Sequence, residues 1–135
     1  MHNHFTGQNT TFDEGDIYAM TAVLNGSKMA NVSTFTSTVV TPSGTYMLAI
    51  NNSANFITFA ANATEANIQL ALQLYGYYTS TGTPQPNATQ ELALASFLSG
   101  GNTGLTLLKL DSNGNFDALS YNATTNQLTT TNCNN

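Results

Sequence analysis

The chain has 135 residues, enough for one domain with a buried core, and only 7% of them are charged, against roughly 25% in ordinary soluble domains. Lys28 and Lys109 are its only strong cations and its net charge is -5, so the sequence excludes the basic surface on which nucleic-acid binding depends. No apolar run approaches the roughly 20 residues of a membrane-spanning helix, and we predict no membrane insertion.

Asn, Ser, Thr and Gln take the place of charged side chains. Most of these side chains are short, so they lose less rotamer entropy than Lys or Glu when they are packed, and they bring no like-charge repulsion between subunits. The composition therefore predicts a homo-oligomer, or assembly with other structural subunits. The alternative is an acidic secreted monomer with an amide-rich surface.

The first segment, residues 1–12, is predicted to be a polar arm that packs against a neighbouring subunit. His2 and His4 in this arm have the spacing of one face of a strand, and we expect them to be disordered or packed against a neighbour; a shared metal ion is the alternative. The densest negative charge of the chain follows, at Asp13, Glu14 and Asp16. It predicts a solvated turn, with calcium at a subunit junction as the alternative.

Apolar residues mostly alternate between clusters of Gly, Asn, Pro and Ser, which is the period of half-buried strands. Strands over 16–24 and 28–40 are predicted to form a hairpin around Asn25-Gly26, because both central positions of such a turn need positive φ. Pro42-Ser43-Gly44 predicts the next turn.

A second hairpin is predicted from strands over 45–50 and 56–61, joined by a longer loop. One face of its first strand would carry Tyr46, Leu48 and Ile50. This face is expected to lie in the core.

The segment 67–78 fits two periods. Its alternating apolar residues are Ile68, Leu70, Leu72 and Leu74, and from this alternation we predict a strand. The alternative is a helix, whose apolar stripe would be Ile68, Ala71, Leu72 and Tyr75.

One short helix is predicted over 88–98, after a polar loop. Asn87 would cap its first turn, with Gln90 three residues later, and Gly100-Gly101 would end it. The predicted element is the only helix in an otherwise β-rich pattern.

The last hairpin pairs strands over 104–111 and 116–122, and residues 123–135 form a polar tail. The pattern predicts an all-β, mainly antiparallel fold. It would be a single β-sandwich or jelly-roll domain over 13–122, between the arm 1–12 and the tail.

The tip of the last hairpin carries oxygen-bearing side chains at every second position, namely Asp111, Asn113, Asn115 and Asp117. EF-hand-like loops gather calcium ligands in this way, but they need Gly at the sixth position and Glu at the twelfth. This loop has Phe116 and Asn122 there. We predict a hairpin turn whose backbone is bonded by the side chains, with Ca²⁺ as the alternative and the only cofactor suggested.

Two surface features could involve sugars. Seven Asn-X-Ser/Thr sequons occur, and the acceptors predicted to be most exposed are Asn51, Asn62 and Asn87. A second group could stack on a sugar as an aromatic platform, or pack in the core or an interface, and consists of Tyr75, Tyr77 and Tyr78.

No nucleophile motif, phosphate-binding loop or two-His metal motif appears, and no His follows position 4. We therefore predict a protein that is not an enzyme. The lone Cys133 has no internal disulfide partner, so it either bridges subunits or stays a free thiol.

These features predict a non-enzymatic structural subunit located on a virion or an extracellular surface. No secretory signal is visible at the start of the sequence, which favours a virion component such as a capsid, decoration or spike protein. The alternatives are a glycosylated cell-surface or spore-surface filament subunit and a carbohydrate-binding β-sandwich module.

Overall fold

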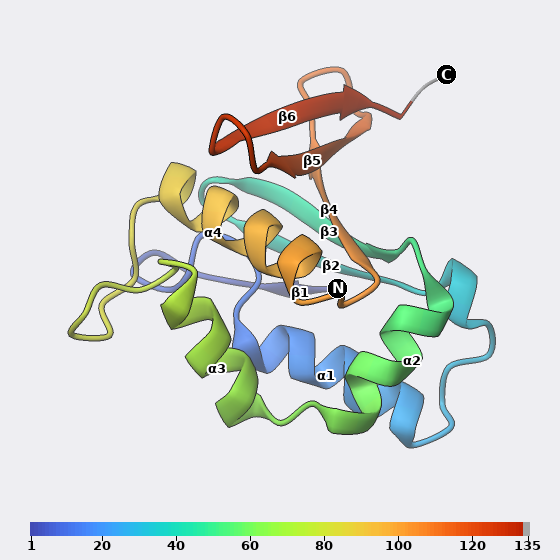
Figure 1. Cartoon of the computed structure of the whole chain (residues 1–135). Coiled ribbons are helices and arrows are strands. Elements are labelled where there is room, and N and C mark those ends of the chain that lie inside the picture. The colour runs from blue at the N-terminus through green and yellow to red at the C-terminus, as the bar shows by residue number, and fades with distance from the viewer. Residues whose placement is uncertain (134–135) are drawn as a thin grey trace.

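The computed structural model describes residues 1–133, which form four α-helices, one 3-10 turn and six strands (Figure 1). The strands are β1 (His2–Asn3), β2 (Thr36–Thr41), β3 (Gly44–Ile50), β4 (Leu105–Leu110), β5 (Phe116–Asn122) and β6 (Gln127–Asn132). The helices are α1 (Glu14–Asn25), α2 (Ser53–Asn62), α3 (Glu65–Leu74) and α4 (Asn87–Gly100), and the 3-10 turn η1 (Val32–Thr34) precedes β2.

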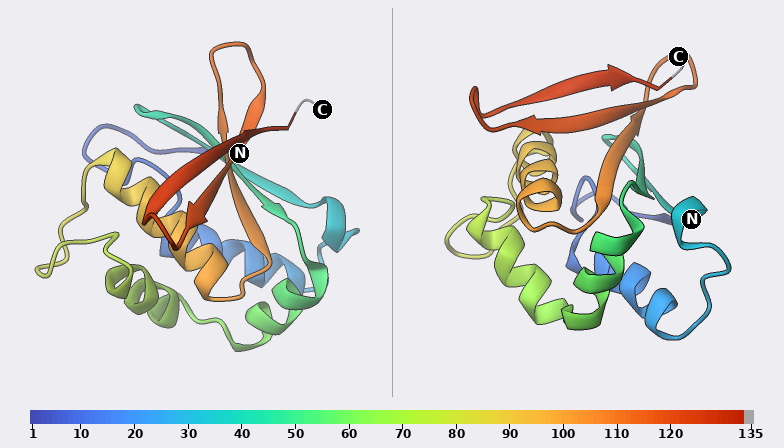
Figure 2. Two further views of the ribbon diagram at one scale, coloured as in Figure 1. Left: turned by 45° about the horizontal axis from the view of Figure 1, so that its top comes forward. Right: turned by 45° about the vertical axis from the view of Figure 1, so that its right-hand side comes forward.

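The strands make one sheet in the order β1-β2-β3-β4-β5-β6. Strand β1 runs parallel to β2, and every other neighbouring pair is antiparallel. The helices lie on one side of this sheet, with α4 beneath the β5–β6 hairpin and α1, α2 and α3 farther from it (Figure 1 and Figure 2). The sheet therefore has a covered face and an open face.

The core lies between the covered face and the helices. Tyr46, Leu48 and Ile50 are buried on this face, as their alternation in the sequence predicted. They pack in one cluster with residues of the helices and of the segment before α1, among them Phe12, Ile17, Phe56, Leu72 and Leu94. Strand β3 thus contributes three side chains to the core between the sheet and the helices.

The prediction of an all-β sandwich or jelly roll is wrong, because three segments predicted as strands are helices. Residues 16–24 lie in α1, 56–61 in α2, and most of 67–78 in α3. Burial at helical spacing is the physical reason, since α1 buries Ile17, Met20 and Thr21, and α2 buries Phe56 and Ala60. The protein is an α/β fold with a mixed sheet.

Helix α3 shows why the alternation of apolar residues led to the wrong prediction of a strand. Ile68 and Leu72, four residues apart, are buried, whereas Leu70 and Leu74 are 56% and 78% exposed. A strand would have placed all four side chains on one face, but a helix separates them into a core pair and a solvent pair. The exposed leucines complete the alternating pattern in the sequence, but their side chains are not buried.

Side-chain caps mark the starts of the three missed helices. Asp13, Asn52 and Thr64 each accept a hydrogen bond from a backbone N–H three residues later. The predicted hairpin at Asn25-Gly26 is also wrong. It is the end of α1, where the Gly26 N–H donates to the carbonyl of Ala22 over 2.9 Å.

Several local signals predicted the structure correctly. Pro42-Ser43-Gly44 lies at the turn between β2 and β3, the predicted helix 88–98 lies within α4, and the last hairpin is β4 and β5. The predicted cap at Asn87 is wrong, however, because Pro86 is the N-cap of α4 and no side chain caps this helix. The expected polar arms are instead part of the sheet, since β1 pairs with β2 and β6 pairs with β5. No helix within residues 1–133 is long and apolar enough to cross a membrane.

A polar cluster joins α4 to the covered face of the sheet. Oε1 of the buried Glu91 accepts hydrogen bonds from the Tyr46 hydroxyl at 2.6 Å and from Lys109 Nζ at 2.5 Å. Asn87, one turn earlier on α4, donates to the Tyr46 oxygen at 2.8 Å. The hydrogen bonds to Glu91 and Tyr46 raise the pKa of Lys109, although burial acts to lower it.

We expect the protein to lose stability as the pH rises above about 10. The pKa values of Tyr46, Tyr77 and Tyr78 are all raised, in each case first by burial. An unfolded chain would release these phenolic protons at about pH 10, whereas the folded protein keeps them, so unfolding is favoured as the pH increases. The raised pKa of Lys109 acts in the same direction.

Alkaline titration checks this expectation. Circular dichroism should report unfolding in the pH range in which the ultraviolet absorbance of tyrosinate also increases. Ionisation of all six tyrosines while the native circular dichroism persists would contradict it.

Candidate metal centre

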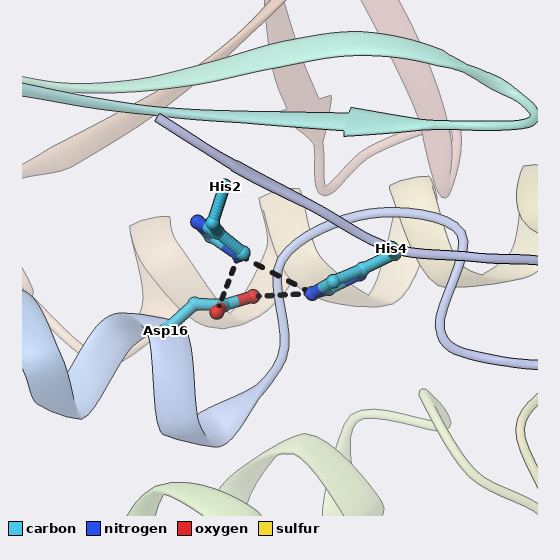
Figure 3. Close-up of side chains that lie close together, drawn as sticks. All are labelled: His2, His4 and Asp16. Carbon is cyan, nitrogen blue, oxygen red and sulfur yellow. Dashed lines mark hydrogen bonds and ion pairs between the residues drawn. The ribbon is translucent and has the colours of Figure 1, made fainter.

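His2, His4 and Asp16 bring three metal-ligating side chains together at the start of the chain (Figure 3). Their ligand atoms all lie within 4.8 Å of one another. Within residues 1–133 they are the only group of three His, Cys, Asp or Glu side chains that meets this condition. The site joins two elements, because the histidines flank Asn3 in the β1 segment and Asp16 lies in the first turn of α1.

The parallel pairing of β1 with β2 places the two imidazoles. His2 is opposite Val39, and the His4 N–H donates to the carbonyl of Val40 over 2.8 Å. Residues two apart in an extended chain point to the same side. The prediction that His2 and His4 share one face of a strand is thus confirmed, and that face looks toward α1 (Figure 3).

A capping box positions the carboxylate. The Asp16 N–H donates to Asp13 Oδ1 over 3.1 Å, and the Asp13 N–H donates back to Asp16 Oδ2 over 3.0 Å. Asp16 therefore has a fixed orientation that does not depend on the histidines. Its second role, as a possible ligand, uses lone pairs that the capping bond leaves available.

Two of the three distances in the cluster match the spacing of ligand atoms around a tetrahedral ion. His2 Nε2 is 3.3 Å from His4 Nε2, and His4 Nε2 is 3.2 Å from Asp16 Oδ2. Ligand atoms about 2.0 to 2.1 Å from a tetrahedral zinc ion lie about 3.3 Å apart. The remaining distance, 2.7 Å from His2 Nε2 to Asp16 Oδ1, is that of a direct hydrogen bond.

The second nitrogen of His4 determines what its Nε2 can do. His4 Nδ1 is 2.9 Å from the backbone carbonyl of Asn9, which can only accept, so Nδ1 carries a proton. In the neutral ring Nε2 then presents a lone pair to the carboxylate oxygen of Asp16. Two lone pairs at 3.2 Å repel each other unless a proton, on the ring or on the carboxyl group, or a metal ion lies between them.

Burial is graded across the site. The side chains of His4 and Asp16 are 8% and 13% exposed, and that of His2 is 39% exposed. Burial, followed by the negative charge of Asp13, raises the pKa of Asp16, and the Asp13 backbone hydrogen bond and the two histidines oppose this rise. A metal ion would neutralise a carboxylate that is poorly solvated, and it would remain reachable from the His2 side.

A second layer of polar groups holds the ligands. Asn9 accepts from His4 through its carbonyl, and its side-chain amide donates to Asp13 Oδ2 at 3.2 Å and to the Tyr78 oxygen at 3.3 Å. The Tyr78 hydroxyl in turn donates to Glu14. A carbonyl that fixes the tautomer of a ligating histidine is a common feature of metal sites.

Asp16 is the member of the site that sequence reasoning missed. It was grouped with Asp13 and Glu14 as an acidic turn, and no pattern in the sequence brings that turn to the histidines. The spacing Asp13-x-x-Asp16 is a capping-box signal, and it could have shown that a helix begins there. No protein-family model, curated protein or solved structure matched the chain, so the site is judged on its geometry.

The predicted calcium loop is a hydrogen-bonded turn. Asp111 Oδ1 accepts from the backbone N–H groups of Asn113 and Asn115, each at 2.8 Å. The bond from Asn115 is the main reason that the pKa of Asp111 is lowered. Asp117 lies in β5 opposite Lys109. The side-chain bonds match the favoured prediction of a turn, and calcium binding there stays a prediction.

The three tyrosines lie in different environments. Tyr77 is fully buried and its hydroxyl donates to the carbonyl of Phe12 over 2.7 Å. Tyr78 is half-buried, and its ring meets that of Tyr77 edge to face. Tyr75 is exposed beside Phe97. Of these three tyrosines, only Tyr75, which is 39% exposed, offers part of its ring to a sugar.

The sequon residues are also in different settings. Asn51 and Asn62 are exposed, whereas Asn87 is half-buried and uses its amide nitrogen to bond Thr10 and Tyr46. A glycan on Asn87 would compete with these two contacts. Glycosylation stays a prediction at all three positions, and Cys133 is an exposed free thiol.

Proposed function

We propose that this protein binds one divalent first-row transition-metal ion through His2, His4 and Asp16, and that the ion fastens strand β1 to helix α1. The supporting observation is the convergence of His2 Nε2, His4 Nε2 and the Asp16 carboxylate, with the bond between His4 Nδ1 and the Asn9 carbonyl directing His4 Nε2 toward Asp16. A metal ion at this point would be bound by both the imidazole nitrogen and the carboxylate oxygen.

The proposed role is structural. Strand β1 pairs with β2 through only two residue pairs, which on their own hold the start of the chain weakly. An ion shared by β1 and α1 would add a link between the sheet and the helical layer. Three protein ligands leave at least one coordination position for water or another molecule.

Zn²⁺ is the ion that the ligands favour as a first probe. Imidazole and carboxylate ligands at tetrahedral spacing suit zinc, whereas calcium takes six to eight oxygen ligands and seldom uses imidazole. Copper binds such sites more tightly still. In competition experiments, Cu²⁺ should therefore displace both Ni²⁺ and Zn²⁺.

Isothermal titration with Zn²⁺ at about pH 7.5 tests the proposal, on protein that carries no histidine tag. We expect one equivalent of zinc to bind and the thermal midpoint to rise with zinc concentration. His4→Ala and Asp16→Asn should each weaken binding by at least roughly tenfold. Asp16→Asn keeps an oxygen for the Asp13 N–H, so the helix cap should persist.

Asp111→Asn is the matched control, because it removes one carboxylate from the β4–β5 turn, and β4 lies three strands from β1 in the sheet. This variant should bind zinc like the wild type. Absence of stoichiometric zinc binding would reject the proposal, and so would an Asp16→Asn variant that binds zinc with unchanged affinity.

A second candidate function is that of a non-enzymatic structural subunit in an assembly on a virion or an extracellular surface. The composition supports an assembling protein, and the open face of the sheet adds a specific observation, since strands β2 to β6 direct no charged side chain to it. Light scattering on the purified protein tests this candidate, because assembly requires particles larger than one chain of 14.3 kDa.

A further inference from the structure

A row of uncharged side chains crosses the open face of the sheet, with one residue from each of five strands. The paired residues along it are Thr38 with Met47, Met47 with Leu108, Leu108 with Ala118, and Ala118 with Thr131. Their neighbours Leu48 and Leu107 are buried on the covered face, and successive residues of a strand point to opposite faces. The row therefore lies on the side that no helix covers (Figure 2).

The charged residues of these strands point the other way. Strands β2 to β6 contain only Lys109 and Asp117, which are opposite each other in β4 and β5. Lys109 is also opposite Tyr46 and bonds Glu91 of α4, so both residues belong to the covered face. The other carboxylates lie in helices, directly before α1, or in the β4–β5 turn.

The open face has the layout of a protein interface. Met47, Leu108 and Ala118 form an apolar centre, and the surrounding outward positions are mostly threonine and serine. Further apolar side chains on this face are Val40 and Leu110, each 36% exposed, together with Ala49 and with Phe116, which is opposite Leu110. Five strands about 4.8 Å apart and about 20 Å long give a footprint of roughly 500 Å², against the roughly 800 Å² that each partner buries in a standard interface.

We propose that two copies of this chain pack against each other through the open faces of their sheets. This inference rests on the structural-subunit candidate and names the surface that it would use. Each copy has a net charge of -5, so two copies repel unless they meet through a face without charge. A face-to-face pair of sheets about 10 Å apart, related by a two-fold axis, would bring the two apolar centres together.

Sedimentation equilibrium on the wild type and three variants tests the inference. The wild type should be a dimer at micromolar concentration, and Leu108→Glu should be a monomer, because it places a charge at the centre of both faces. Thr38→Lys adds a charge at the edge of the same row and spares the apolar centre. It should weaken dimerisation even if Leu108→Glu fails to fold.

Leu74→Glu is the matched control, since Leu74 is 78% exposed on α3 and the substitution makes the same change in charge. It should leave the dimer intact. A wild type that stays monomeric would overturn both the inference and the structural-subunit candidate. A dimer that persists in Leu108→Glu or Thr38→Lys, or one that Leu74→Glu alone dissociates, would overturn the open-face interface and leave self-association standing.

Discussion

Replacing Gly104 with Ala is expected to lower the free energy of unfolding by about 3 kcal/mol or more. Gly104 has φ +71, and a Cβ there would lie 2.3 Å from the carbonyl oxygen of Asn52 and 2.6 Å from the backbone N of Phe56. Both atoms belong to the start of α2, where backbone cannot move aside as a flexible side chain can. The Gly104 carbonyl also accepts from the N–H groups of Asn51 and Asn52, at 2.9 Å and 3.2 Å.

The expected loss at Gly104 has two causes, the positive φ and the clash of a Cβ with backbone atoms. Gly114→Ala measures the cost of the positive φ alone. Gly114 has φ +84, but a Cβ there meets no atom within 4 Å, so only the left-handed backbone conformation is penalised. We expect a loss of about 1 kcal/mol for this variant. Urea unfolding of both variants gives the comparison, and equal losses would show that the contact between Gly104 and the start of α2 is not tight.

Part of the fold could be predicted from sequence signals that span only a few residues. The central strand β3, the turn at Pro42-Ser43-Gly44, helix α4 and the β4–β5 hairpin each carry a period or a stop signal of their own. Helices α1, α2 and α3 are short and contain residues suited to either period. Whether these segments form helices or strands depends on which side chains are buried against the rest of the protein. In α3, Ile68 and Leu72 are buried, but Leu70 and Leu74 are not.

The candidate metal site, too, could be predicted only in part from the sequence. The proximity of His2 and His4 follows from their spacing in an extended segment, so the sequence was enough to predict it. The third ligand, Asp16, arrives only because β1 pairs in parallel with β2 and thereby faces α1. Pairing between segments so far apart in the chain leaves no mark in a single sequence, and a polar start of the chain gives no hint that it joins a sheet.

Removing the carboxylate of Glu91 is expected to be the second most damaging of the changes described. Glu91→Ala would leave the Tyr46 hydroxyl and the Lys109 ammonium without their shared acceptor at the junction of α4 and the sheet. Loss of one partner from a buried pair costs about 3 to 5 kcal/mol, but the Lys109 side chain is 32% exposed and water compensates part of its charge. We therefore expect a loss of about 2 kcal/mol in urea unfolding.

A double-mutant cycle determines whether this loss arises from the unpaired ammonium. Lys109→Met removes the charge and retains most of the apolar stem, so Glu91→Ala should cost less in that background than in the wild type. Glu91→Gln keeps an oxygen for the Tyr46 hydroxyl and should fall between the wild type and Glu91→Ala. If the cost of Glu91→Ala is the same in both backgrounds, the cluster stabilises the fold through the Tyr46 hydrogen bond, and the ion pair contributes nothing measurable.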